Sequence, residues 1–169
     1  MDDNDQPTPD PVMARIIEAV QLGQSGTPTQ ARHLLTELWD EIGPTGDALH
    51  RCTLAHYLAD LQDTAEAELV WDERALAAAA DLTDERARRH DDDLRVRGFL
   101  PSLHLNLADV HRRLGHVGPA GEHLATARQL VDALPDDAYG DMIRAGIRGV
   151  AEALEAGSTR RLGTVPSAG

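Results

Sequence analysis

The sequence predicts an all-α fold built from stacked helical hairpins, and three observations carry that prediction. Hydrophobic residues make up 41% of the chain but aromatic residues only 3%, so alanine and leucine must build the core. These two residues favour helices, whereas strands prefer β-branched and aromatic side chains. Glycine and proline separate segments of helical length, and one pattern of small and large residues recurs three times.

The recurring pattern places a small residue inside each helix of a hairpin, next to large apolar residues. The clearest copy reads His104-x2-Leu107-Ala108-x2-His111, then Gly115, then Ala120-x3-Leu124-x2-Ala127. An earlier copy reads Arg51-x2-Leu54-Ala55-x2-Leu58, then Gln62, then Ala67-x3-Trp71. The first reads Arg15-x2-Glu18-Ala19-x2-Leu22, then Gly26, then Ala31-x3-Leu35-x2-Leu38. Repeated hairpins bury a core only by stacking on their neighbours, and stacking creates a grooved surface.

This pattern resembles the tetratricopeptide repeat (TPR), a helix–turn–helix unit of about 34 residues. The resemblance covers residues 12 to 134. It implies an α-solenoid of three TPR-like antiparallel hairpins, which a C-terminal capping helix closes. In such arrays the concave groove binds a segment of another protein.

The repeats are degenerate. Arg15, Arg51 and His104 replace the first aromatic residue of the family, and Glu18 replaces its first leucine. Ala31 and Ala67 are 36 residues apart but Ala67 and Ala120 are 53 apart, so the later interval carries an insertion of 17 residues. A generic helical bundle is the alternative fold.

We expect one domain with two flexible ends. Residues 1–11 hold four aspartates and three prolines and predict a disordered acidic tail, residues 12–156 form the repeat domain, and residues 157–169 predict a second disordered tail. The predicted helices run from Pro11 to about Gln24, from Pro28 to about Ile42, from the cap Asp47 to near Asp63, through Leu69 to Ala80, onward from Pro101, from about Pro119 to Leu134 and from about Tyr139 to Glu155. Thr27 and Asp47 are the expected N-caps of the second and third of these helices.

Residues 83–98 are a charged segment with five arginines and five acidic residues. We interpret it as a solvated extra helix with ion pairs, which begins at Thr83. Gly98 is expected to end this helix, and Pro101 is expected to open the next one.

Charge and composition bound the function. The net charge of −13 disfavours binding to nucleic acid or to an anionic membrane. All 16 basic residues are arginine, which suggests GC-rich coding.

The single cysteine excludes an internal disulfide and fits a reducing compartment. No signal peptide or long apolar run is visible, so we expect a soluble, cytoplasmic protein. The chain has no P-loop, no G-x-S-x-G and no paired cysteines, and we expect neither catalysis nor a cofactor.

Cys52, His56 and Asp60 have the spacing i, i+4, i+8, which puts them on one side of a helix. The resemblance turns that side toward the groove. A thiolate, an imidazole and a carboxylate are able to hold a metal ion, or to form an activated thiol with His56 as its base. We favour the simpler interpretation, in which cysteine packs as a small hydrophobe and no metal binds. His104, His111, His116 and His123 are likewise interpreted as packing residues.

Other residues are expected in the groove through the resemblance. Asp109, Arg112 and Arg113 lie on the groove side of the fifth helix if the repeat holds, and arginine there is suited to bind a carboxylate of a partner. The alternative is that Arg112 or Arg113 pairs with Asp109 or with acidic residues of other helices. Ile16 and Val20 stand where some tetratricopeptide modules carry the lysine and asparagine that hold a C-terminal carboxylate, so that type of ligand is disfavoured. The complete predicted groove set is Ile16, Val20, Cys52, His56, Asp60, Leu105, Asp109, Arg112 and Arg113.

The sequence therefore predicts a non-enzymatic protein–protein interaction module. Its concave groove is expected to bind a peptide or helix of a partner protein, apolar at one end and polar at the other. Two alternatives stay open. One is a self-associating structural module, a homodimer completed at the degenerate first repeat. The other is a metal or thiol site at Cys52, His56 and Asp60.

Overall fold

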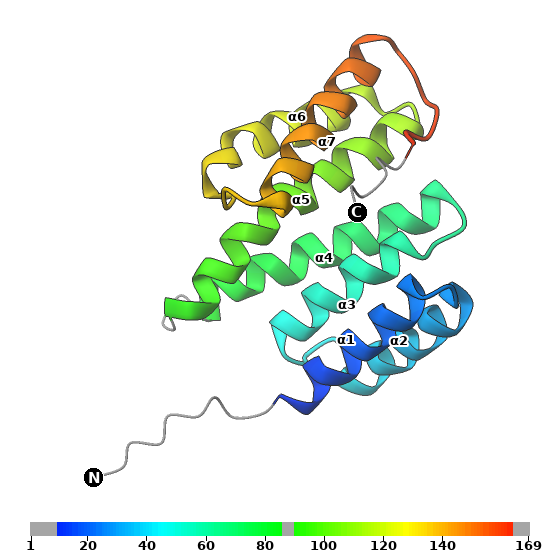
Figure 1. Cartoon of the computed structure of the whole chain (residues 1–169), viewed down its shortest axis with the longest axis vertical. Helices are drawn as coiled ribbons and strands as arrows, with labels where there is room; N and C mark the ends of the chain where they lie inside the picture. The colour runs from blue at the N-terminus through cyan, green and yellow to red at the C-terminus, as the bar shows by residue number, and fades with distance from the viewer. Residues whose placement is uncertain (1–9, 86–89, 164–169) are drawn as a thin grey trace.

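A computed structural model describes residues 10–85 and 90–163, with side chains described for 10–82 and 98–163. Over these residues the chain forms seven α-helices and one 3-10 turn, with no strand (Figure 1). The helices are α1 (Pro11–Gln24), α2 (Pro28–Ile42), α3 (Ala48–Asp60), α4 (Ala65–Glu85), α5 (His90–Arg113), α6 (Val117–Gln129) and α7 (Ala138–Glu155), and the 3-10 turn η1 (Val131–Ala133) precedes α7. The predicted all-α fold class is confirmed.

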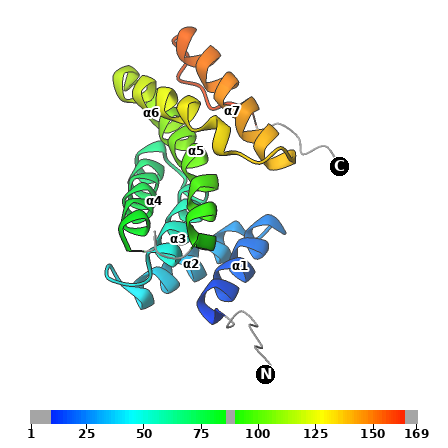
Figure 2. The same cartoon turned by 90° about the vertical axis from the view of Figure 1, so that its left-hand side faces the viewer.

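Helices adjacent in sequence pack against one another. The closest pairs are α3 with α4 and α5 with α6, and α7 packs on both α5 and α6. Figure 2 shows α1 and α7 on one side of the molecule and α4 and α6 on the other.

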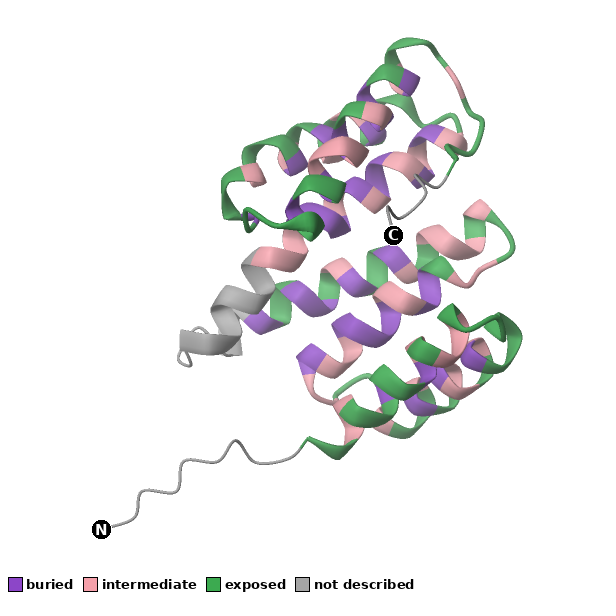
Figure 3. Cartoon of the chain, in the orientation of Figure 1, coloured by how far each residue is buried: buried purple, intermediate pink, exposed green. Residues whose placement is uncertain are grey.

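Alanine lets neighbouring helices approach closely. Three clusters of buried residues follow one another along the chain, centred on α1–α3, on α3–α5 and on α5–α7. The small repeat residues Ala31, Ala55, Ala108 and Ala120 are each fully buried in the helix–helix contacts. Figure 3 shows that buried residues follow the faces by which helices meet. These four positions of the pattern are packing positions, whereas the corresponding Ala67 is only half-buried.

The predicted helix boundaries were correct where glycine or aspartate fixes the backbone. Gly26 and Gly115 have φ values of 104° and 77°, a region in which glycine has no Cβ penalty. The Asp47 carboxylate accepts hydrogen bonds from the backbone N–H groups of Leu49 and His50, as expected of an N-cap. Thr27 is the N-cap residue of α2, as predicted, but its hydroxyl donates to the carbonyl of Leu22 and makes no capping hydrogen bond.

The charged segment does not form a separate helix. Residues 83–85 end α4, and α5 begins at His90, ahead of Gly98 and Pro101. The insertion therefore lengthens two helices of the array to 21 and 24 residues. Pro101 is fully buried inside α5, where it removes one backbone hydrogen bond without ending the helix.

The ends of the described chain are fixed by polar contacts. The Asp10 carboxylate caps α1 by accepting from the N–H of Met13, at 2.9 Å. After α7, residues 157–163 run back along α5, although we expected a disordered tail from residue 157. No helix in the described ranges has both the length and the apolar character needed to span a bilayer.

Candidate functional site

A pocket of about 490 Å³ opens between α3, α5 and the η1–α7 region. We call it the aromatic pocket. It is lined by His56, Tyr57, Gly98, Phe99, Ala133, Leu134, Pro135 and Tyr139. The segments that form it are far apart in sequence, so the packing of α7 on α5 creates it.

The aromatic pocket collects most of the aromatic side chains of the protein. The chain contains two tyrosines, one phenylalanine and two tryptophans, and both tyrosines and the phenylalanine line this pocket. The His56 ring lies 5.3 Å from the ring of Tyr57 and 6.0 Å from that of Phe99, centroid to centroid. The Tyr139 hydroxyl reaches the carbonyl of Gly98 at 3.5 Å. Aromatic side chains of this kind are enriched where proteins bind partners.

Gly98 keeps the pocket open. It lies within α5, and a Cβ built on it meets no atom within 4 Å. Glycine weakens a helix, so its presence here costs stability without relieving a backbone clash. What it leaves is free space at the wall of the aromatic pocket.

A smaller hollow of about 190 Å³ continues from the aromatic pocket toward α1. It is lined by Val20, Gly23, Gln24, Leu35, Tyr57, Asp60 and Leu61. Tyr57 belongs to both linings and joins them. We refer to the two together as the inner groove.

Asp60 is the acidic group of the inner groove. The residue is exposed, but protein atoms surround its carboxyl and this desolvation raises its pKa. The nearby Glu68 carboxylate raises the pKa further, whereas His56 and the Arg161 guanidinium lower it. Burial, together with the charges of Asp60 and Tyr139, raises the pKa of the Tyr57 hydroxyl. Asp60 and Tyr57 line the smaller hollow together, and Tyr57 and Tyr139 line the aromatic pocket together.

His56 sits between this acidic end and the aromatic pocket. Burial lowers the pKa of its imidazole, which favours the neutral ring at pH 7. Its Nδ1 lies 3.4 Å from the side-chain nitrogen of Asn106 on α5. The ring is thus an uncharged wall of the groove.

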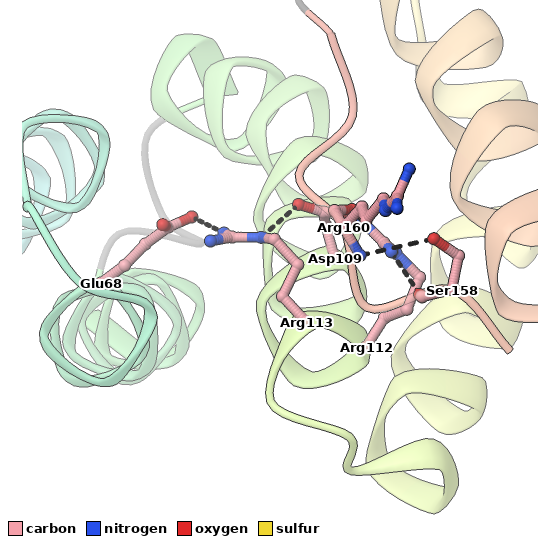
Figure 4. A network of polar contacts seen from close by, with 6 residues as sticks. All are labelled: Glu68, Asp109, Arg112, Arg113, Ser158 and Arg160. Carbon is pink, nitrogen blue, oxygen red and sulfur yellow. Dashed lines mark hydrogen bonds and ion pairs between the residues drawn. The ribbon is translucent and has the colours of Figure 1, made fainter.

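A polar network crosses the molecule behind the groove (Figure 4). Arg113 on α5 bonds to Glu68 on α4, and its Nε donates to Asp109 at 2.9 Å. Asp109 also accepts from Arg112 at 2.6 Å. Arg112, only 2% exposed, donates in turn to the backbone carbonyls of Ser158 and Arg160. The network ties the second hairpin to α5 and α5 to the C-terminal segment.

Asp72 on α4 is a buried acid beside this network. It is 1% exposed, and neither carboxyl oxygen has a hydrogen-bond partner among the described residues. Burial, reinforced by the charges of Glu68 and Asp60, raises its pKa to about 8. The Asn106 side chain and Arg113 oppose this shift. Asp72 is therefore largely protonated at neutral pH.

The structure brings three of the nine predicted groove residues to the groove. Val20, His56 and Asp60 line it. Ile16 and Cys52 are core residues at 0% and 3% exposure, and Leu105 is buried against Gly146 of α7. Asp109, Arg112 and Arg113 bond to one another and to Glu68, which matches the alternative of internal pairing and not a free binding surface. An arginine on an inner helix face is satisfied internally here because α4 and the C-terminal segment present carboxylate and carbonyl oxygens to it.

The geometry gives no support to a thiol or metal site at Cys52. Burial raises the pKa of the Cys52 thiol to about 12, which keeps it protonated and unreactive. Throughout the described residues, no three histidine, cysteine, aspartate or glutamate side chains gather as a metal site.

Sequence reasoning missed the aromatic pocket. Tyr57, Phe99 and Tyr139 come from three helices, and no local spacing connects them. One signal was present, because in a chain with so few aromatic residues each partly exposed one is a candidate for binding. Asp72 gave no such signal, because α4 also carries Glu66, Glu68 and Glu73.

No protein-family model, curated protein or solved structure matches this chain.

Proposed function

We propose that this protein is a non-enzymatic interaction module that binds a peptide or helix of a partner protein along the inner groove. The observation that carries the proposal is the convergence of both tyrosines and the phenylalanine on one open pocket. Burying such side chains in a folded core would stabilise the chain, yet here they border a cavity of about 490 Å³. Tyrosine and phenylalanine in that position supply large contact areas to a partner.

Polar groups at one end of the groove fit the same proposal. Asp60 lies at the α1 side, and the apolar lining by Phe99, Leu134 and Pro135 lies at the α7 side. A segment that is polar at one end and apolar at the other would match both. The groove holds no nucleophile beside a general base, which is why we favour binding over catalysis.

A cavity-filling substitution tests the proposal without removing any existing side-chain contact. Gly98→Gln adds a side chain to the pocket wall at a helical position with free space around it. Gly121→Gln is the matched control, because Gly121 is also helical, on α6, and a Cβ added there likewise meets no atom within 4 Å.

The measurement is affinity capture from an extract of the source organism, read by mass spectrometry. We expect wild type and Gly121→Gln to retain the same partner and Gly98→Gln to lose it. Equal retention by both variants would refute binding at the aromatic pocket. Retention of only a second copy of the chain by all three proteins would favour the self-associating module instead.

A further inference from the structure

The inner groove carries acid that the protein's own bases do not neutralise. Glu68 and Asp109 are each paired with Arg113, and Arg112 is paired with Asp109. Asp60 stands outside these pairs, whereas the buried Asp72 is largely protonated and lines neither hollow. Asp60 lines the groove and forms no ion pair among the described residues, so a ligand that brings positive charge would pair with it.

The aromatic rings next to Asp60 suit the same ligand. Tyr57 lines the smaller hollow together with Asp60 and lines the aromatic pocket together with Tyr139. A guanidinium or ammonium group is attracted to the face of an aromatic ring, and a carboxylate nearby adds a charge-assisted hydrogen bond. Phe99 and the His56 ring complete the apolar wall on the α5 side.

The C-terminal segment of the chain already brings a guanidinium group, that of Arg161, near Asp60. Arg112 fixes the backbone of residues 158 and 160, and the next residue, Arg161, lies close enough to Asp60 to lower its pKa. The side chains of Arg160, Arg161 and Leu162 are exposed. The C-terminal segment thus presents two bases and an apolar residue at the edge of the groove.

We propose that the inner groove selects a partner segment with an arginine or lysine side chain, whose charged group binds between Asp60 and the rings of Tyr57 and Tyr139. In the free protein, Arg161 occupies the acidic end of this site and competes with the partner. The inference rests on the proposed function and names the chemistry of the ligand. The net charge of −13 would also attract a basic partner over a longer range at low salt.

The test uses the full chain and two labelled peptides, with binding measured by fluorescence anisotropy. The basic peptide, Gly-Ser-Thr-Arg-Arg-Leu-Gly, copies residues 157–163, and the neutral peptide replaces both arginines by glutamine. Three variants are compared with wild type. Asp60→Asn removes the acid, Asp40→Asn makes the same change at an exposed position on α2, and Arg161→Gln removes the internal competitor.

We expect Arg161→Gln to bind the basic peptide more tightly than wild type, by about fivefold or more, because the acidic end becomes free. Asp60→Asn should bind it about tenfold more weakly than wild type, the scale of one charge-assisted hydrogen bond. Asp40→Asn should match wild type. Circular dichroism of each variant shows whether its helix content is unchanged.

Several results would overturn the inference. Equal binding of the basic peptide by Asp60→Asn and wild type would exclude recognition by that carboxylate. No gain in Arg161→Gln would exclude the internal competitor. If neutral and basic peptides bind equally and Gly98→Gln abolishes both, the ligand chemistry proposed here is wrong while the groove remains the binding site. If neither peptide binds to any variant, the inference also fails, and partner capture still tests the proposed function separately.

Discussion

Single residues carry the strongest departures from ordinary packing in this protein. A buried carboxyl with no hydrogen bond is rare, because desolvation of the charged form is expensive and the group responds by keeping its proton. Asp72 is such a group among the described residues, and its environment combines burial with two neighbouring acids, Glu68 and Asp60. It therefore couples folding to pH.

We predict that Asp72→Asn removes a loss of stability that wild type undergoes as the pH rises from about 4 to about 8. The folded pKa, about 8, lies above the ordinary value of 3.8, so stability is complete below pH 3.8 and falls as pH rises toward 8. Each pH unit in that window costs about 1.4 kcal/mol. Near pH 8 the variant should be more stable than wild type by on the order of 3–5 kcal/mol, and near pH 4 the two should be similar.

Urea unfolding of both proteins at several pH values measures the difference. Asp40→Asn serves as control, because that carboxylate is exposed on α2. Parallel pH profiles for wild type and Asp72→Asn would show that Asp72 ionises normally in the folded chain.

Cys52 gives a second prediction at this scale. The thiol is 3% exposed and its pKa is raised to about 12 by burial. At pH 8 the native chain should react with an aromatic disulfide reagent at least about a hundredfold more slowly than the urea-unfolded chain, because reaction needs an exposed thiolate. Comparable rates in the two states would place Cys52 at the surface and revive the thiol hypothesis.

At the scale of elements, the insertion between Ala67 and Ala120 changes the helices more than any other feature of the sequence. It lengthens α4 and α5, and it brings Gly98 and Pro101 into the middle of a continuous helix. Local propensity alone argues against such a helix, yet the packing of α4 along α5 outweighs the lost hydrogen bond.

We predict that Gly98→Ala stabilises the protein by about 0.5–1 kcal/mol, because alanine restricts the unfolded chain and favours the helix. Its Cβ meets no atom within 4 Å, so no clash offsets the gain. Thermal and urea unfolding measure the effect. A loss of stability would mean that α5 is interrupted near Gly98.

Much of the fold could be predicted at the element scale, and the reason is periodic packing. Ala31, Ala108 and Ala120 are small because a neighbouring helix lies against them. Such small residues recur at regular spacing along the sequence, so they can be recognised without the structure. The site could not be predicted in the same way. Arg112 and Arg113 have the right position for a groove, but their partners Ser158 and Glu68 are at least 45 residues away. Tyr57, Phe99 and Tyr139 meet only after α7 has packed on α5.

At the scale of the whole molecule, two kinds of titrating group act in opposite directions. Burial lowers the pKa values of His56, His104, His111 and His123, and neighbouring histidines lower the last three further. The facing Nδ1 atoms of His104 and His123 are 3.0 Å apart, so at most one of them carries a proton comfortably. Because their pKa values are lowered, these histidines contribute a stability that is complete above pH 6.5 and is lost as the pH falls below that value.

Stability should therefore pass through a maximum near pH 6.5. Below that pH the histidines lose their contribution, although Glu73 and Glu122 moderate the effect at His111 and His123. Asp72 lowers stability across the whole range from pH 3.8 to about 8, and above pH 6.5 no further gain from the histidines offsets this loss. Urea midpoints between pH 5 and pH 8.5 measure the profile, and His123→Gln should flatten its acid side. A monotonic profile across this range would contradict the argument.

The tryptophans and the tyrosines lie in different regions of the molecule, so their optical signals report on different places. Trp39 on α2 and Trp71 on α4 lie edge to face with ring centroids 5.1 Å apart, and the Arg74 guanidinium covers the Trp71 ring at 4.4 Å. The aromatic pocket contains both tyrosines and neither tryptophan. Tryptophan emission consequently reports on the joint between the first and second hairpins, whereas tyrosine absorbance reports on the groove.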